Sequence, residues 1–260
     1  MNQTVGAPVQ IRENIYQFNE TNEFGPYVDS YLIIGTEKAL VVDALQTDTG
    51  LYEAVRKVTD KPLVLFITHG HLDHAGVSVK EFHDAGVPIY MSHKDLALLA
   101  GRTGYGAEKD WFLDVQPGTV FDIGGLVFHA IPVNGHSQGS YVLLDYENQL
   151  LFSGDSIGSG HFWMQLANCS PLSVFQKELD RLVVECAKCP ELLVFPGHRN
   201  QSPVQLTGQY VQDVKTITDR ILDGTWKGKE ASLAWRDRVM QYHEISYGQM
   251  VSYCYDPEKL

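Results

Sequence analysis

The chain has 260 residues, 44% of them hydrophobic and 20% charged, which is ordinary for a globular protein with one substantial core. Its formal net charge of −12 argues against a nucleic-acid partner, because phosphate binding needs clustered Lys and Arg, and it leaves small-molecule substrates open. No apolar run is long enough to span a membrane and no basic stretch precedes an apolar one at the N-terminus, so we expect a cytoplasmic protein without a membrane partner.

The amino-terminal half predicts a strand meander followed by alternating helices and strands. Apolar and β-branched runs predict strands at 9–18, 27–34, 39–43, 62–67 and 87–91. Apolar residues at helical spacing predict helices at 49–59, 77–85 and 93–100, with Ser92 as the N-cap of the last. This alternation is typical of an α/β protein.

The carboxyl-terminal half continues the alternation. Strands are predicted at 119–123, 126–131, 141–145, 149–152 and 192–195. Amphipathic helices are predicted after Pro171 and over 203–222, and a final hairpin within 239–255. We predict one domain over residues 1–260, in which 201–260 form a C-terminal helix and hairpin extension.

Four potential metal ligands follow the strand predicted at 62–67. They are His69, His71, Asp73 and His74, and a short loop at the end of a buried strand can aim all of them into one pocket. Imidazole nitrogens and a carboxylate oxygen suit Zn²⁺, and also iron or manganese. A surface loop is the plainer interpretation, but it does not explain why three of the ten histidines surround an acid at one strand end.

The motif His69-Gly-His-Leu-Asp-His74 resembles the HxHxDH signature of the metallo-β-lactamase fold hydrolases. Three further residues follow in the order of that family, each after a strand-like run: His136, Asp155 and His198. The resemblance covers roughly residues 8 to 200. It implies a four-layer αββα sandwich, in which two sheets face each other and helices cover their outer sides.

The resemblance also implies a dinuclear metal site, with zinc as the first choice of metal and iron or manganese as alternatives. His69, His71 and His136 would hold the first ion, Asp73, His74 and His198 the second, and Asp155 would bridge them. Ions about 3.5–4 Å apart can share a hydroxide that attacks the substrate. Asp73 would also orient this hydroxide or accept its proton, which makes it the predicted catalytic residue.

The bridging Asp155 bears on the reaction. In the resembled family, the thioesterase, lactonase and phosphodiesterase branches carry such an Asp, and the β-lactam-hydrolysing enzymes generally lack it. We therefore expect hydrolysis of an ester-like bond in a thioester, a lactone or a related small molecule. Gln138 and Ser140 depart from the glyoxalase and lactonase pattern, so the substrate stays open. A phosphodiesterase and a mononuclear iron dioxygenase acting on a persulfide are the alternatives.

Two segments are candidates for the substrate pocket. Glycines around His161 and Trp163 predict a loop near the metals, and Trp111 lies in the irregular segment 101–118, which in the resembled fold often forms the pocket wall. The alternative is that these aromatic residues only pack on the body of the protein.

The pair Cys186 and Cys189 has the spacing of a zinc knuckle or a redox motif. A closed zinc site needs four ligands and no second close pair exists, so we expect reduced thiols without a function. The assembly stays open, with a homodimer as one option.

Overall fold

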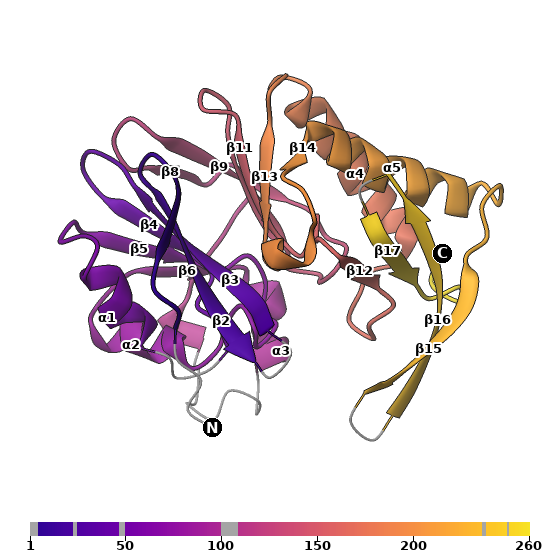
Figure 1. Ribbon diagram of the computed structural model, residues 1–260, viewed down its shortest axis with the longest axis horizontal. Helices are drawn as coiled ribbons and strands as arrows, with labels where there is room; N and C mark the ends of the chain where they lie inside the picture. Colours follow the sequence, from indigo (N-terminus) through magenta and orange to yellow (C-terminus); the bar gives the residue numbers. More distant parts are fainter. Residues whose placement is uncertain (1–4, 23–24, 47–49, 100–108, 236–237, 249) are drawn as a thin grey trace.

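The computed structural model describes residues 5–22, 25–46, 50–99, 109–235, 238–248 and 250–260. Two sheets face each other, with helices on their outer sides (Figure 1). A third, smaller sheet lies beside the second. Within the described residues, no helix has the length and apolar character that crossing a membrane requires.

The first sheet comes from the amino-terminal half and has seven strands in chain order. They are β1 Val9–Arg12, β2 Ile15–Asn22, β3 Gly25–Ile34, β4 Ala39–Val42, β5 Leu63–Phe66, β6 Ile89–Met91 and β7 Leu113–Asp114. The helical segments of this half are α1 Leu51–Arg56, α2 Ser78–Asp84, η1 His93–Asp95, α3 Leu96–Leu99 and η2 Lys109–Trp111. The Ser92 side chain accepts a hydrogen bond from Lys94 N, which confirms the predicted N-cap.

The second sheet has six strands in the order β14-β13-β11-β10-β9-β8. They are β8 Val120–Asp122, β9 Val127–Pro132, β10 Tyr141–Asp145, β11 Leu150–Gly154, β13 Leu193–Pro196 and β14 Leu206–Thr207. Its outer side is covered by α4 Leu172–Cys186 and α5 Gly208–Leu222, and the short η3 Arg199–Gln201 follows β13.

The third sheet has the order β12-β17-β16-β15. Its strands are β12 His161–Met164, β15 Lys229–Trp235, β16 Arg238–Tyr247 and β17 Met250–Tyr255. In Figure 1 the β15–β16 hairpin extends away from the body of the protein. Phe162 and Tyr253 of this sheet pack with the helices α4 and α5 in one core.

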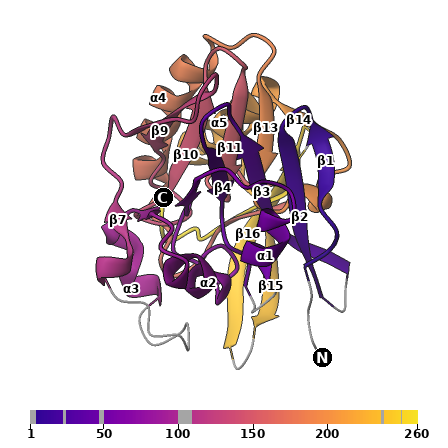
Figure 2. The same ribbon diagram turned by 90° about the vertical axis from the view of Figure 1, so that its left-hand side faces the viewer.

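Three apolar cores lie between the layers and hold them together. One core joins α1 and α2 to the first sheet, the second lies between the two sheets, and the third joins the second sheet to α4 and α5. The turned view shows the helices on opposite outer sides (Figure 2). Strands such as β4 and β10 are buried along their whole length because both faces are covered, which explains their continuous apolar sequences. This arrangement confirms the predicted αββα fold.

The predicted first strand over 9–18 and the predicted helix over 203–222 are wrong in their extent. Asn14 adopts a left-handed conformation with φ 61°, and the chain turns there to pair β1 with β2. The helix begins only at Gly208, because Leu206 and Thr207 form a strand that pairs with β13 instead.

The predicted loop around His161 and the predicted single final hairpin are also corrected. His161–Met164 is strand β12, which pairs in parallel with β17. The tail has three strands rather than two, since β15 precedes the β16–β17 pair. The pairing of β12 with β17 joins distant segments of the chain, so a short window of sequence does not contain both strands.

Candidate metal centre

The predicted metal ligands lie at one edge of the two facing sheets, beyond the carboxyl ends of four strands. Loops after β5, β9, β11 and β13 carry them, and these last three strands run in the same direction within the second sheet. Among the described residues three ligand groups form. The first group is His69, His71 and His136, and the second group is Asp73, His74 and His198. The third, His69, His74 and Asp155, shares one histidine with each of the other two. Within each group the ligand atoms lie within 4.8 Å of one another. The fold therefore brings together all seven residues predicted as ligands.

The first group consists of imidazoles alone. His71 Nδ1 lies 3.0 Å from His69 Nε2 and 2.9 Å from His136 Nε2. Nitrogens on a tetrahedral zinc ion at ~2.0–2.1 Å are separated by roughly 3.3 Å, so this spacing is close to that of a ligand set. Burial and the neighbouring histidines lower the pKa of His69, and they lower the pKa of His136 to about 4. His69 and His136 are therefore neutral near pH 7 and have lone pairs for a metal.

The second group mixes imidazoles and carboxylates. Asp73 Oδ2 lies 3.5 Å from His198 Nε2 and 3.9 Å from His74 Nε2. Burial alone would lower the pKa of both histidines, but Asp155 and Asp73 beside them raise it. Conversely, burial favours protonation of the two carboxyls, and the histidines hold their pKa values below the usual range. The charged forms of the histidines and of the carboxylates therefore stabilise each other in this group.

Asp155 stands between the two groups. Its Oδ2 lies 3.6 Å from His136 Nε2, 3.5 Å from His74 Nε2 and 3.3 Å from His198 Nε2. One carboxylate therefore reaches nitrogens of both the first and the second group.

Two buried polar atoms test whether the site fits a metal. His74 Nε2 and Asp155 Oδ1 have no hydrogen-bond partner among the described residues. Such atoms are rare in native proteins because each lost hydrogen bond in a buried place costs about 1–3 kcal/mol. Gly197 keeps the space beside them, since a Cβ there would lie 2.3 Å from His74 Cε1 and 2.8 Å from Asp155 Oδ1. The residues present fit divalent metal ions.

Each ligand histidine is held from outside through its other ring nitrogen, as is usual for metal ligands. The partners are Thr68 Oγ1 for His69 at 3.1 Å, Asn168 Nδ2 for His71 at 2.9 Å, Asp43 Oδ2 for His74 at 2.7 Å, the Trp163 carbonyl for His136 at 2.7 Å and the Tyr27 carbonyl for His198 at 2.6 Å. These contacts fix the ring orientations.

Two buried carboxylates hold the ligand loops. Asp43, at φ 64°, accepts hydrogen bonds from Thr68 N at 2.8 Å and Thr68 Oγ1 at 2.9 Å, besides its contact with His74. Asp95 accepts from Gly70 N, Ser137 Oγ and Gly139 N at 2.9, 2.6 and 2.7 Å. Asp95 thereby ties the loop after β5 to the loop after β9.

Several residues that hold the predicted ligands were not identified as such from the sequence. Tyr27 donates from its hydroxyl to Asp73 Oδ2 at 3.0 Å, and Asn168 donates to the His136 carbonyl at 3.2 Å. Ser140, which departs from the resembled pattern, lies 2.6 Å from Ser137 Oγ and completes the bonding around Asp95. None belongs to a metal-binding motif, so only an alignment of relatives could have marked them.

The predicted pocket residues have different surroundings. The Trp163 side chain is half-buried and His161 is exposed, and both point to the face of β12 opposite the buried Phe162 and Met164. Trp111 stacks on His83 of α2 with ring centroids 3.8 Å apart, while its neighbour Phe112 is buried in the first core. Residues 101–108 of the predicted wall segment lie outside the described residues. A substrate contact of His161, Trp163 and Trp111 stays a prediction.

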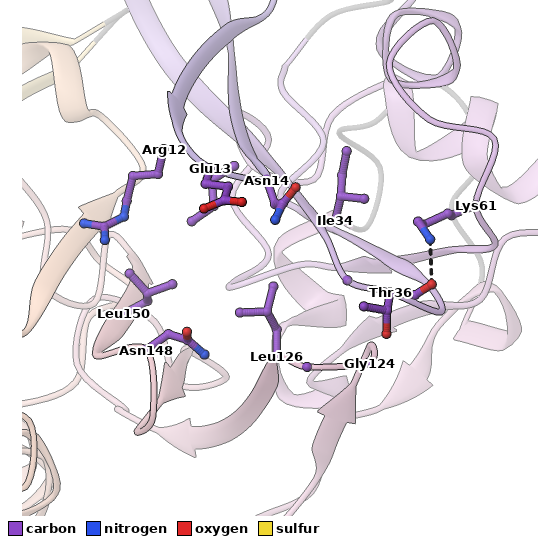
Figure 3. A pocket seen from close by; sticks show the side chains of 13 residues that line it. Arg12, Glu13, Asn14, Ile34, Thr36, Lys61, Gly124, Leu126, Asn148 and Leu150 are labelled. Carbon is purple, nitrogen blue, oxygen red and sulfur yellow. Dashed lines mark hydrogen bonds between the residues drawn. The ribbon is translucent and has the colours of Figure 1, made fainter.

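Two cavities lie away from the metal centre. One of about 560 Å³ opens at the other ends of the strands, between Arg12, Lys61 and Asn148 (Figure 3). The other, of about 570 Å³, is lined in part by Cys186 and Cys189. Both thiols are free and buried, burial raises their pKa values, and neither joins a metal-ligand group of the described residues.

A comparison with protein families gives one match, to the metallo-beta-lactamase superfamily over residues 25–198. The chain belongs to the metallo-beta-lactamase superfamily. The match covers more than half of the chain and includes all seven predicted ligands. It confirms the resemblance inferred from the motifs.

Relatives of this superfamily member include enzymes with named activities. Acyl-coenzyme A thioesterase MBLAC2 of Gallus gallus is 27% identical over 220 residues, which cover 68% of this chain and 74% of its own. Hydroxyacylglutathione hydrolase GloC of Haemophilus influenzae is 27% identical over 140 residues, covering 50% of this chain and 66% of its own. These relatives confirm the prediction of an enzyme of the hydrolase class.

Solved structures confirm the fold of this superfamily member. A metallo-beta-lactamase from Pontibacter korlensis superimposes with a TM-score of 0.64 at 18% identity, covering 83% of this chain and 99% of that one. At this identity the likeness concerns the fold alone.

Proposed function

We propose that the protein is a dinuclear metal-dependent hydrolase that cleaves an ester-like bond in a small molecule. The observation that carries the proposal is the position of Asp155 Oδ2, within 3.3–3.6 Å of ligand nitrogens from both groups. A carboxylate in that position suits a bridge between two ions. The three imidazoles on one side and the Asp73, His74 and His198 set on the other supply ligands for both.

When bound, two divalent ions, with zinc as the first choice, would acidify a shared water and polarise a substrate carbonyl. Asp73 is the only acid of its loop, and Tyr27 holds one of its oxygens in place. That carboxylate can orient the attacking oxygen and accept its proton at Oδ1, the oxygen opposite the one held by Tyr27.

A thioester is the first substrate class to consider. The relatives include an acyl-coenzyme A thioesterase and a hydrolase named for hydroxyacylglutathione. A lactone is the second.

The proposed pocket residues are His161 and Trp163 on β12, whose backbone already reaches His136, together with Trp111. The net charge of −12 supports a small molecule over a nucleic acid.

The test combines elemental analysis with a panel of thioesters, lactones and phosphodiesters. We expect two ions per chain at saturation and the fastest turnover on a thioester. The Asp155→Asn protein should retain fewer ions while remaining folded, because the neutral amide is a poor bridge. Saturation of the parent protein at one ion would refute the two-ion proposal.

The same sample distinguishes the main rival. Oxygen consumption with a persulfide substrate and a single bound iron, without hydrolysis of any ester, would assign the protein to the dioxygenase alternative instead.

A further inference from the structure

The two ligand groups are held from outside by different side chains. We propose that Tyr27 and Asn168 are positioning residues that set the affinities of the two metal positions separately. Tyr27 would act on the group of Asp73, His74 and His198, and Asn168 on the group of His69, His71 and His136. This inference rests on the two-ion site proposed above, and it adds which residues outside that site control each position.

Tyr27 holds two of the three members of its group. Its hydroxyl donates to Asp73 Oδ2 at 3.0 Å, and its carbonyl accepts from His198 Nδ1 at 2.6 Å. Its ring also lies against the His198 ring, with centroids 5.3 Å apart. Because β3 carries Tyr27 and the loop after β13 carries His198, this one residue connects ligands delivered by the two facing sheets.

Asn168 holds two of the three members of the other group. Its side-chain nitrogen lies 2.9 Å from His71 Nε2 and donates to the His136 carbonyl at 3.2 Å. The residue lies between β12 and α4, in a segment where Cys169 Sγ also donates to the His136 carbonyl at 3.2 Å. The other four ligand histidines meet an oxygen at their outer nitrogen, so the amide of Asn168 is the exception among the described contacts.

The proton count at His71 explains why an amide matters. His71 turns Nδ1 towards His69 and His136, so an ion held by this group would take Nδ1, and the ring proton would then be on Nε2. A proton on Nε2 needs an acceptor, and the amide nitrogen is a donor. A half-turn of the amide presents its oxygen instead. Metal binding would therefore require Asn168 to turn its side-chain oxygen, in place of its nitrogen, towards His71 Nε2. The affinity of the first position for the ion should then depend on whether residue 168 offers an acceptor.

The two residues act on separate groups. Of the predicted ligands in the described part of the chain, Tyr27 forms hydrogen bonds with Asp73 and His198 alone, and Asn168 with His71 and His136 alone. Since no ligand is shared between these pairs, a change at one residue should leave the opposite position unaltered.

The experiment titrates zinc into metal-free protein while the ring 1H–15N signals of the ligand histidines are followed. Signals of His71 and His136 report the first position, and those of His198 the second. We expect Tyr27→Phe to weaken zinc at the second position about 10–100-fold, the usual effect of losing an outer partner, with the first unchanged. Asn168→Leu should weaken only the first position, by a similar factor.

Two further variants distinguish a specific effect on the metal positions from a general loss of protein stability. Asn168→Asp keeps the size and offers only acceptors, so its first position should bind zinc at least as tightly as the parent. Tyr31→Phe removes a buried hydroxyl of the same strand, which donates to the Pro196 carbonyl at 2.6 Å and touches no ligand. It should lower the stability and leave both zinc affinities unchanged.

The outcomes are distinct. A parent protein that binds one ion refutes the two-ion proposal and this inference with it. A parent that binds two ions, together with Tyr27→Phe and Asn168→Leu proteins that match it or lose both positions equally, refutes the inference alone. Loss confined to the second position in Tyr27→Phe and to the first position in Asn168→Leu confirms it.

Discussion

Asp73 differs from the other ligands because its Oδ2 meets a phenol as well as the imidazoles. Tyr27 donates to that oxygen at 3.0 Å, while His198 Nε2 lies 3.5 Å from it. The histidines hold the pKa of the carboxyl well below its usual range although burial opposes this. The group therefore remains charged throughout the pH range in which the enzyme would work.

Replacement of this carboxylate should abolish most of the activity. Asp73→Asn keeps the size and removes the charge, so we expect turnover to fall by about 10²–10⁴-fold, the usual scale of general acid–base catalysis. Turnover, circular dichroism and metal content are measured on the same sample, with the exposed Asp84→Asn as the control. Near-parent turnover of a folded and fully metallated protein would mean that Asp73 only shapes its loop.

His136 makes the metal-free protein sensitive to acid. Burial lowers its pKa from 6.5 to about 4, so the unfolded chain takes up a proton that the folded protein refuses. This stabilising contribution is complete above pH 6.5 and is lost as the pH falls through about 4. The shift corresponds to roughly 3 kcal/mol, at about 1.4 kcal/mol per unit.

The measurement is urea unfolding of chelator-treated protein at pH 7 and near pH 4. The parent should lose roughly 3 kcal/mol more than His136→Gln, which has no ring to protonate. Equal losses in the two proteins would contradict the assignment of a neutral, buried His136.

At the scale of the elements, strand ends position the chemistry. Loops after β5, β9, β11 and β13 deliver the ligands, and β12 contributes a backbone carbonyl to His136. That carbonyl is held because β12 pairs along its whole length with β17. The side chains of β12 alternate, and the contact with His136 comes from the backbone of Trp163, so a change of its side chain keeps the carbonyl that orients the predicted ligand.

The Trp163→Ala change tests β12 as a wall of the substrate pocket. Its backbone contact with His136 remains, so we expect an unchanged metal content and an altered ranking of substrates in the hydrolysis panel. His161→Ala, on the same face of the strand, is the matched comparison. An unchanged ranking and unchanged rates in both proteins would show that these side chains only pack against the protein.

In the whole molecule, the metal centre joins the two facing sheets. Asp73 and the first three histidines follow the first sheet, whereas His136, Asp155 and His198 follow the second. Ions bound between them would act as cross-links that the unfolded chain lacks, so the folded state should gain stability by mass action. The gain is about 2.7 kcal/mol per site when the free metal reaches 100 times its dissociation constant.

Removal of metal should therefore lower the unfolding midpoint of the whole protein and not merely its activity. Unfolding curves with zinc and with a chelator measure the difference. The His198→Ala protein, which lacks a ligand from the second sheet, should gain less from zinc than the parent does. If the parent unfolds identically with zinc and with chelator, the ions do not hold the halves together.

The amino-acid sequence by itself determined which seven residues are predicted as ligands and how the layers are built. The motif at His69–His74 and three single residues each follow an apolar run, and such runs are buried on both faces in strands like β4 and β10. These signals are local, because a few consecutive side chains decide whether a strand is covered on both sides and where it ends. Family membership and the αββα sandwich followed from them.

Only the tertiary structure decided the rest. The parallel pairing of β12 with β17 joins residues far apart in the chain, and Tyr27 meets Asp73 across 46 positions and Asn168 meets His71 across 97. Contacts of this kind depend on the packing of whole layers, so a short stretch of sequence carries no sign of them. The split at Asn14 has a local cause, a left-handed residue, but its sequence also fits an unbroken strand until the pairing of β1 with β2 selects the turn.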